Sequence, residues 1–434
     1  MISKRKAISW IFIGGLFACL LLFAIPSLRG RLVSNLNELR VQARYALNPP
    51  QQAVFVPEEA VATIVDATMQ AFSRTSTPIA SLTPASAAPT PTPQFTSTPT
   101  QTPTPLPESV ALNGVRYQDQ HGLWNYCAPA NLAMGLSYWG WQGERTDVGP
   151  VLKPFEKDKN VMPYEMADYV QTYTNLNALV RHGGTLETLK RLIAAGFVPL
   201  IEKGIVIRDI NGKLGWMGHY STITGYDDAK KVFITQDSYF EPNFKVSYDE
   251  LLWQWRSFNY IFLVIYPPER EAELLDLLGP YADPQTAFQI AAQTAAEEAV
   301  RLDGVEKFFA YFNRGTSLVN LQDYAGAAST YDQAFALMAG LPEKDRPWRM
   351  MWYQTGPYFA YYYTGRYQDV ERLATTTLDA AAEPFLEESY VWRARSRLAL
   401  GNRSAAAEDV RKALEYHPGF TPAVELANLL GIQP

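Results

Sequence analysis

The sequence predicts an α+β domain followed by an all-α region, with a single membrane-spanning helix in front of both. Three observations lead to this fold class: an apolar run at residues 7–25, strand-like segments mixed with short helices over residues 109–270, and helical periodicity over residues 281–434. A chain of 434 residues has room for two folded domains plus tails. Its net charge of -6 is modest and mixed along the chain, so nothing indicates a nucleic-acid partner.

The apolar run predicts a membrane anchor. Residues 7–25 are almost all apolar and are long enough to cross a bilayer core of about 30 Å. Lys4, Arg5 and Lys6 precede the run and favour a cytoplasmic N-terminus. We therefore expect residues 1–26 to form the cytoplasmic N-terminus and transmembrane helix of a single-pass protein of the cell membrane. A cleaved signal peptide is the alternative, although the apolar run is longer than a typical signal core.

Two segments separate this helix from the first folded domain. Residues 27–73 are expected to form a short helical stalk, because leucines recur near helical spacing until Pro49 stops the pattern. Residues 74–108 are dominated by Pro, Thr, Ser, Ala and Gln, which cannot bury enough apolar surface to fold and so predict a disordered, extended linker. Such tracts often hold a domain off the outer face of a membrane, so we expect extracytoplasmic soluble domains. An ordinary linker inside the cell is the alternative.

Cys127 is the one cysteine outside the apolar run, and it stands where a loop runs into a helix, in NYCAPANLAMGLSYWGW. Pro129 fits the first turn of a helix, and Leu132 and Leu136 follow at helical spacing. The thiol would face the positive end of the helix dipole, which favours the thiolate. A lone cysteine at a helix start is more often a small buried apolar residue. A nucleophile therefore needs partners elsewhere in the chain.

His219 and Asp237 are the candidate partners. The segments 217–226 and 231–239 alternate in polarity around the turn-like DDAK, which predicts a β-hairpin centred near Asp228. In that hairpin the indices of opposed residues add up to about 456, which pairs His219 with Asp237, with Cβ atoms roughly 4.5–5.5 Å apart. A carboxylate in that place would orient the imidazole. A register shift of one residue would separate them onto opposite faces.

An acyl-transfer site also needs a donor for the developing oxyanion, usually a backbone amide together with a side-chain amide. Gln118 and Gln120 both precede Cys127. Gln120 is the better candidate, because the intervening HGLWNY can form a short loop that returns its amide to the thiol. Gln118 remains possible, and the backbone N–H of Cys127 would be the second donor.

These segments resemble the stand-alone relatives of the double-glycine (bacteriocin-processing) cysteine peptidases, a branch of the papain-like fold. The matching stretches are NYCAPANLAMGLSYWGW, DKNVMPYEMADYV, GGTLETLKRLIAAGFVPLIE, GWMGHYSTITGYDD and YIFLVIYPP. The resemblance implies a papain-like domain over residues 109–270 and a peptide or protein substrate. It also implies that Cys127 is the nucleophile, His219 the general base, Asp237 the orienting acid and Gln120 the oxyanion glutamine.

This chain departs from the family pattern at three points. Ala128 replaces the usual glycine after the cysteine, Ser238 replaces the usual proline after the aspartate, and Gln120 lies farther from the cysteine than usual. The departures put the oxyanion geometry in question more than the nucleophile. A non-catalytic peptide-binding module is one alternative, and an amidase or acyl transferase on the same fold is another. No cofactor is implied, and the remaining histidines show no metal-ligand spacing.

Residues 281–434 resemble tetratricopeptide repeats. In LGNRSAAAEDVRKALEYHPG, Gly401, Ala406, Ala413 and Pro418 occupy the positions of the family pattern. Weaker copies are NLQDYAGAASTYDQAFAL and YYYTGRYQDVERLATTTLDAA. The copies recur at intervals of 43 and 36 residues, near the usual period of about 34. Stacked helix pairs of this kind present a surface to a protein partner or act as a passive cap.

Overall fold

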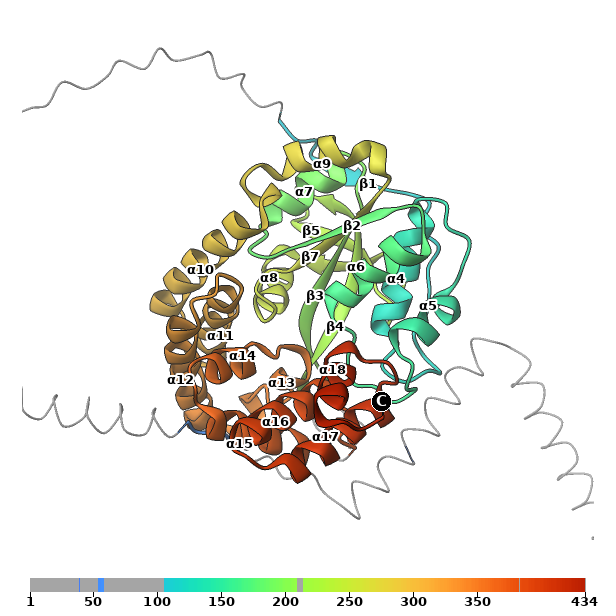
Figure 1. Ribbon diagram of the computed structural model, residues 1–434. Coiled ribbons are helices and arrows are strands. Elements are labelled where there is room, and N and C mark those ends of the chain that lie inside the picture. The colour runs from blue at the N-terminus through green and yellow to red at the C-terminus, as the bar shows by residue number, and fades with distance from the viewer. Residues whose placement is uncertain (1–38, 40–53, 58–104, 209–213, 382, 434) are drawn as a thin grey trace, which may run out of the picture.

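A computed structural model describes residue 39 and residues 54–57, 105–208, 214–381 and 383–433 (Figure 1). The predicted membrane helix lies outside these residues, as does most of the predicted stalk and linker. Within the described ranges, no helix combines the length and the apolar character needed to cross a membrane. The predicted order of an α+β domain followed by an all-helical region is confirmed.

A seven-stranded antiparallel sheet forms the centre of the α+β domain. The strands run in the order β2-β7-β3-β4-β5-β6, and β1 pairs with one end of the long strand β4. β7 is a continuous apolar run, and all five of its residues are buried, as expected for a central strand. The strands are β1 (Ser109–Ala111), β2 (Asn177–Arg181), β3 (Pro199–Arg208), β4 (Leu214–Asp227), β5 (Val232–Gln236), β6 (Phe244–Ser247) and β7 (Phe262–Tyr266).

Helices cover both faces of this sheet (Figure 1). One apolar cluster joins β3, β4 and β7 to α4 (Cys127–Tyr138), α5 (Arg145–Leu152) and α6 (Pro163–Tyr173). A second cluster, on the other side, joins the sheet to α7 (Leu186–Ala194), α8 (Tyr248–Arg256) and α9 (Glu271–Leu278). The domain is therefore a three-layer structure with the sheet in the middle.

Small residues let α4 lie close to the sheet. A Cβ atom on Gly135 would come within 2.8 Å of the Leu200 side chain and 3.0 Å of the Ile265 side chain. The neighbouring Ala130 and Ala133 are also buried in the contact. This close approach positions the N-terminus of α4, where the cysteine lies, against strand β4.

The chain after β7 is helical throughout its described part. Figure 1 shows these helices as an arc that runs from α9 around one side of the α+β domain to α18. The elements are η1 (Pro268–Arg270), η2 (Gly279–Ala282), α10 (Pro284–Arg301), α11 (Gly304–Asn320), α12 (Tyr324–Gly340), η3 (Glu343–Asp345), α13 (Met350–Tyr353), α14 (Gly356–Tyr363), α15 (Tyr367–Asp379), α16 (Glu387–Ala399), α17 (Arg403–Tyr416) and α18 (Thr421–Leu430).

Three helix pairs in this region share the same turn. The segments resembling tetratricopeptide helices are α12, α15 and α17, and each packs against the helix before it, α11, α14 and α16. In every pair a residue with positive φ stands two positions before the second helix: Gln322 at 62°, Gly365 at 80° and Gly401 at 84°. Two of the three are glycine, which adopts this conformation without strain. The repeated turn accounts for the periodicity seen in the sequence.

The helical region shares a core with the α+β domain. Trp216, Phe258 and Ile261 of the domain belong to the same buried cluster as Phe308 and Phe312 of α11. Polar contacts cross the same boundary, since the side chain of Asn259 donates to that of Ser317 (2.9 Å), Arg349 to the carbonyl of Trp216 (3.2 Å) and Gln354 to the carbonyl of Ser257 (2.7 Å). The helices therefore lie firmly against one end of β3 and β4.

Candidate active site

Cys127 is the first residue of α4. The carbonyl of Tyr126 accepts the N–H of Ala130 at 3.1 Å and so begins the helix, and Pro129 lies in the first turn, where a missing amide proton costs little. Ala128 is buried against the sheet, whereas Cys127 is half-buried. The thiol therefore lies at the positive end of the helix dipole.

His219 lies in β4, and Asp237 follows directly after β5. The predicted pairing of these two residues is wrong by two positions. The indices of paired residues add up to 459 beside the turn, as in Tyr226↔Phe233, and to 458 beyond it, as in Thr222↔Gln236. The reason is that the turn comprises residues 228–231 and is centred later in the chain than the sequence pattern indicates.

A β-bulge in β4 places His219 and Asp237 on the same face of the hairpin. The register shifts by one residue between Ile223 and Gly225. Without that shift the turn would put His219 and Asp237 on opposite faces of the hairpin, because side chains alternate with a period of two. With the bulge they fall on the same face, as diagonal neighbours. The structure accordingly brings them into contact, with His219 Nε2 at 2.8 Å from Asp237 Oδ1.

Asp237 is surrounded by donors. Its Oδ1 accepts the backbone N–H groups of Tyr239 (3.1 Å) and Phe240 (3.2 Å), in addition to its contact with His219. Its Oδ2 accepts the hydroxyl of Ser221 at 3.1 Å and lies 3.2 Å from Lys203 Nζ. Burial opposes ionisation of this carboxyl, but the charges of His219 and Lys203 outweigh it and hold its pKa far below the usual range. Asp237 is therefore a permanent anion.

The protonation states favour an ion pair between Cys127 and His219. Burial works against the imidazolium, yet the charge and hydrogen bond of Asp237, with a further hydrogen bond to Cys127, raise the pKa of His219 to about 9. Burial likewise opposes the Cys127 thiolate, and the hydrogen bond and charge of His219 overcome that effect and lower the pKa of the thiol. Both shifts favour the thiolate–imidazolium form of the pair over the neutral form.

Gln120 lies beside this group. Its backbone N–H donates to the carbonyl of Ser238 at 3.0 Å, and its Oε1 accepts the Ser238 hydroxyl at 2.7 Å. Asn131, fully buried in α4, donates to that same hydroxyl oxygen (3.0 Å) and to the carbonyls of Cys127 (2.9 Å) and Tyr220 (3.0 Å). Ser238, in place of the family's usual proline, thus links Gln120 to the helix that begins with Cys127.

The other candidate glutamine lies elsewhere. Gln118 Oε1 faces the backbone N–H of Arg145, at 3.5 Å, at the start of α5. Of the two residues that the sequence left open, the structure therefore connects Gln120, and not Gln118, to the residues around Cys127 and Asp237.

Lys203 was not expected from the sequence. It lies directly opposite His219 in the β3 and β4 pairing and is only 1% exposed. The adjacent Glu202 is also buried, with no hydrogen-bond partner for its Oε1, and burial raises its pKa well above the usual value. The available signal was a Glu-Lys pair inside the otherwise apolar stretch PLIEKGIVIR. Charged residues inside an otherwise apolar strand are buried in most cases only when another group pairs with them.

The helical region reaches the strand that carries His219. At Gly218, the preceding residue, a Cβ atom would come within 2.8 Å of the Tyr353 ring, and the rings of Trp216 and Tyr353 meet edge to face at 5.7 Å. Glycine at position 218 is therefore what lets α13 pack so close to the site. Nothing local in the sequence relates α13 to His219, because 134 residues separate them.

Among the residues that the structure describes, a group of potential metal ligands lies where the domain meets α16 and α17. Single ligand atoms of Asp158, Glu387 and His417 all lie within 4.8 Å of one another. His417 Nδ1 is 2.8 Å from Glu387 Oε1, so these two groups already satisfy each other. Spacing along the chain could not have shown this group, because its members come from three separate segments. It contributes no side chain to the Cys127 and His219 pair.

Two comparisons with known proteins concern the α+β domain. Residues 112–261 match the model of the Peptidase_C39 like family, which confirms a C39-like domain in this part of the chain, whereas the narrower resemblance to double-glycine (bacteriocin-processing) peptidases stays a prediction. Among solved structures, the chain is similar to a Bacillus anthracis protein provisionally assigned as a C39-like peptidase, with 17% sequence identity and a TM-score of 0.30 over 37% of this chain and 98% of that chain. No curated protein matches the chain.

The chain thus contains a C39-like peptidase domain. That family suggests a cysteine peptidase, and a peptidase domain implies a peptide or protein substrate. The family match ends at residue 261, and none covers the helical region, so its assignment to tetratricopeptide repeats stays a prediction.

Proposed function

We propose that this protein is a thiol-dependent peptidase in which Cys127, His219 and Asp237 perform nucleophilic acyl transfer. The observation that carries the proposal is the hydrogen bond of 2.8 Å between His219 Nε2 and a buried Asp237, beside a thiol of lowered pKa. Because Asp237 occupies Nε2, the Nδ1 atom of His219 is the ring nitrogen that exchanges a proton with the thiol. A histidine held in this way can act first as a base and then as an acid.

In the proposed reaction the Cys127 thiolate attacks the carbonyl carbon of a peptide bond. The imidazolium of His219 protonates the leaving amine, and an acyl thioester remains on Cys127. Water then attacks the thioester, giving up a proton to His219, and the thiolate leaves with the imidazolium restored beside it. Asp237 stays ionised throughout and stabilises the imidazolium at both stages.

The developing oxyanion would be met by two donors, the backbone N–H of Cys127 and the side-chain amide of Gln120. The Oε1 atom of Gln120 accepts the Ser238 hydroxyl, so the NH₂ group is the part of the amide with protons to offer. Ser238 and Asn131 together would fix the plane of that amide. Such a second layer of hydrogen bonds is what holds a catalytic donor in place.

We further propose that the enzyme is anchored in the cell membrane by residues 7–25 and that its folded part is extracytoplasmic. The apolar run, the preceding basic residues and the Pro/Thr-rich linker support this arrangement. The helical region would bind a protein partner, as stacked helix pairs commonly do. Protease added to intact cells tests the orientation: cleavage within residues 74–108 is expected, and full protection would contradict an external domain.

The decisive experiment for catalysis is a cleavage profile. Purified protein is incubated with a peptide library, and new termini are identified by mass spectrometry. Cleavage that disappears in Cys127→Ala and in His219→Ala, but persists in a protein with Cys19→Ala, is expected. If the protein binds library peptides without cutting them, or if Cys127→Ala still cuts, the peptidase assignment fails and the peptide-binding alternative takes its place.

A further inference from the structure

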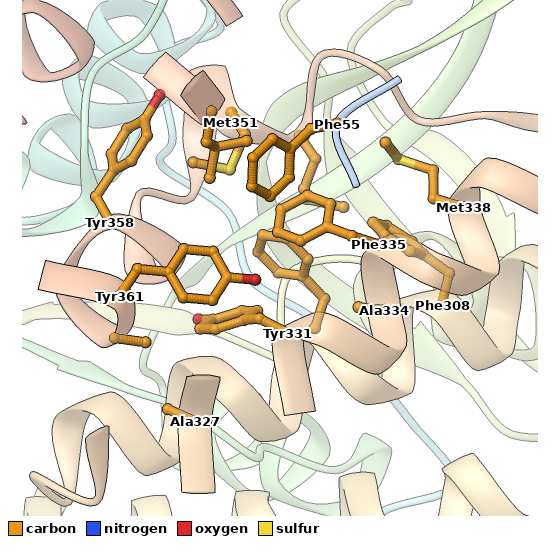
Figure 2. Close-up of a cluster of buried hydrophobic side chains, with 14 of the residues drawn as sticks. Phe55, Phe308, Ala327, Tyr331, Ala334, Phe335, Met338, Met351, Tyr358 and Tyr361 are labelled. Atoms are coloured by element: carbon orange, nitrogen blue, oxygen red, sulfur yellow. The ribbon is translucent and has the colours of Figure 1, made fainter. Parts of the chain in front are cut away.

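A short segment far from the folded part in sequence lies against the helical region. Val54–Pro57 comes from the predicted stalk, yet Phe55 is only 4% exposed and belongs to the same buried cluster as residues of α11, α12 and α14. Figure 2 shows its ring among those of Phe335 and Tyr361. An extended segment thus supplies one of the core side chains of the helical region.

The contacts of Phe55 are specific. Its ring meets that of Phe335 edge to face at 5.1 Å and that of Tyr361 at 6.2 Å, and the guanidinium of Arg372 lies 5.7 Å from its centre. Pro57 is also buried, whereas Val54 and Val56 are half-buried. The segment therefore inserts alternate residues, as an extended peptide does when it lies along a surface.

A groove adjoins the inserted segment. It has a volume of about 760 Å³ and is bordered on one side by the segment itself. The opposite wall belongs to α15 and α16 and consists of Gln368, Glu371, Arg372, Thr375, Thr376 and Arg397. Glu371 and Arg397 form an ion pair at 2.8 Å in this wall. Phe55 thus fills an aromatic socket that includes Phe335 and Tyr361, and the groove beside the segment offers polar side chains able to hydrogen-bond a peptide backbone.

We propose that Val54–Pro57 is a tethered ligand: the helical region is a binding site for an extended peptide with a central Phe, and its own stalk occupies that site in cis. A partner peptide of the same chemistry, with apolar residues around a Phe and a Pro two positions after it, would compete for the socket. The proposal stands apart from the proposed catalysis. It depends only on the contacts of the segment.

Val54–Pro57 has an advantage over a free peptide at this site, because it belongs to the same chain. A segment held on the same chain competes at an effective concentration of about millimolar. A free peptide therefore has to reach that concentration, or bind more tightly, before it displaces the segment. The chain from Pro57 to Pro105 begins and ends on the folded body, so displacement would lengthen the free connection between the residues before Val54 and the α+β domain.

Photo-crosslinking of the full-length protein in detergent tests the contact and the exchange. A photoreactive benzophenone analogue of phenylalanine replaces Phe55, and in a matched control it replaces the half-buried Val56. We expect the analogue at position 55 to crosslink within one chain to peptides of α12, α14 or α15. We also expect millimolar AVFVPE peptide, and not a scrambled peptide, to reduce the yield by more than half. Crosslinks elsewhere, or a yield unaffected by the peptide, would overturn the proposal.

A second measurement uses a variant in which the chain's own segment no longer fills the socket. Fluorescent AVFVPE peptide should bind full-length Phe55→Ala at least about 10-fold more tightly than the unmodified protein, because the site is vacant. Val56→Ala should behave like the unmodified protein. Equal binding to Phe55→Ala and the unmodified protein would show that the peptide does not use this socket. The circular dichroism spectrum of Phe55→Ala checks that the variant is folded, and if it is not, the crosslinking result decides.

Discussion

Replacing Asp237 by Asn should remove the charge that keeps His219 protonated. The pKa of His219 is raised from 6.5 to about 9, which corresponds to about 3.4 kcal/mol in favour of the imidazolium. Asparagine keeps the shape of the side chain but carries no charge, and burial alone would then bring the pKa of His219 below its usual value. The equilibrium constant that favours the thiolate–imidazolium pair over the neutral pair should fall by a factor of at least about 300.

The assay is alkylation of Cys127 by iodoacetamide as a function of pH, with Cys19 replaced by Ser in every protein. The unmodified site should react at pH 6 much faster than an ordinary thiol, because its thiol pKa is lowered. Asp237→Asn should react about 30 times more slowly at pH 7, because a thiol with the usual cysteine pKa of about 8.5 is only about 3% ionised there, and it should reach full rate only above about pH 8.5. The rate of peptide hydrolysis should fall further, by up to about 10⁴, as when the equivalent carboxylate is lost in a serine protease triad.

Ser221→Ala is the matched control. The Ser221 hydroxyl donates to Asp237 Oδ2 at 3.1 Å. Its loss removes one hydrogen bond that holds the Asp237 side chain in place but leaves the charge of the carboxylate unchanged. One hydrogen bond is worth about 1 kcal/mol, and the alkylation profile should keep its shape. The reasoning is refuted if Asp237→Asn is alkylated at pH 6 as fast as the unmodified protein, because the carboxylate would then not determine the ionisation of the pair.

Three further outcomes are expected. Lys203→Met should lower the free energy of unfolding in urea by about 3–5 kcal/mol, because it breaks a buried ion pair, whereas the exposed Lys245→Met should stay within about 0.5 kcal/mol; equal effects would contradict a structural role for Lys203. Gln120→Ala should lower kcat by about 10²–10³ with little change in KM, and Gln118→Ala should change neither; the reverse order would exchange their roles. With the nucleophile replaced by alanine, the contribution of His219 to stability should be fully present below about pH 6.5 and decline as the pH rises through the folded pKa of His219, which Asp237 still raises but which lies below about 9 because the hydrogen bond to Cys127 is lost; a urea midpoint constant from pH 6 to 10 would exclude this.

The shared core has a consequence for the domain arrangement. Because Trp216 and Phe258 lie in one buried cluster with Phe308, separating the helical region from the α+β domain would expose apolar surface on both. Tyr353 also packs on β4 at Gly218, next to His219. The geometry of the candidate site therefore depends partly on helices that the family match does not cover.

Much of the site could be predicted because it depends on local chemistry. The loop-to-helix transition at Cys127 needs only Pro129 and the apolar spacing after it, and the apolar run FLVIY identifies a buried central strand without reference to its neighbours. The helix pairs are likewise visible as repeats, because each second helix follows a turn of the same conformation. These features arise between residues close in sequence, where dihedral preferences and side-chain periodicity act directly.

The tertiary structure alone decided the strand register and which residues from distant segments meet at the site. The predicted pairing of His219 with Asp237 missed the true register by two positions, and the two residues share a face because of a one-residue bulge whose position the alternating pattern does not reveal. The choice of Gln120 over Gln118 depends on Ser238, more than a hundred residues away.

By itself, then, the sequence indicated the order of the two folded regions, the helix that begins at Cys127, the hairpin, and a candidate nucleophile with two candidate partners, since these follow from short-range geometry and from the few residue types able to perform the chemistry. The tertiary structure alone decided the burial of Lys203 opposite His219, the approach of Tyr353 to Gly218 and the insertion of Phe55 among the helices. The physical reason is that burial and electrostatic pairing depend on distance in space. A residue's own neighbours in the chain say little about which distant groups will surround it.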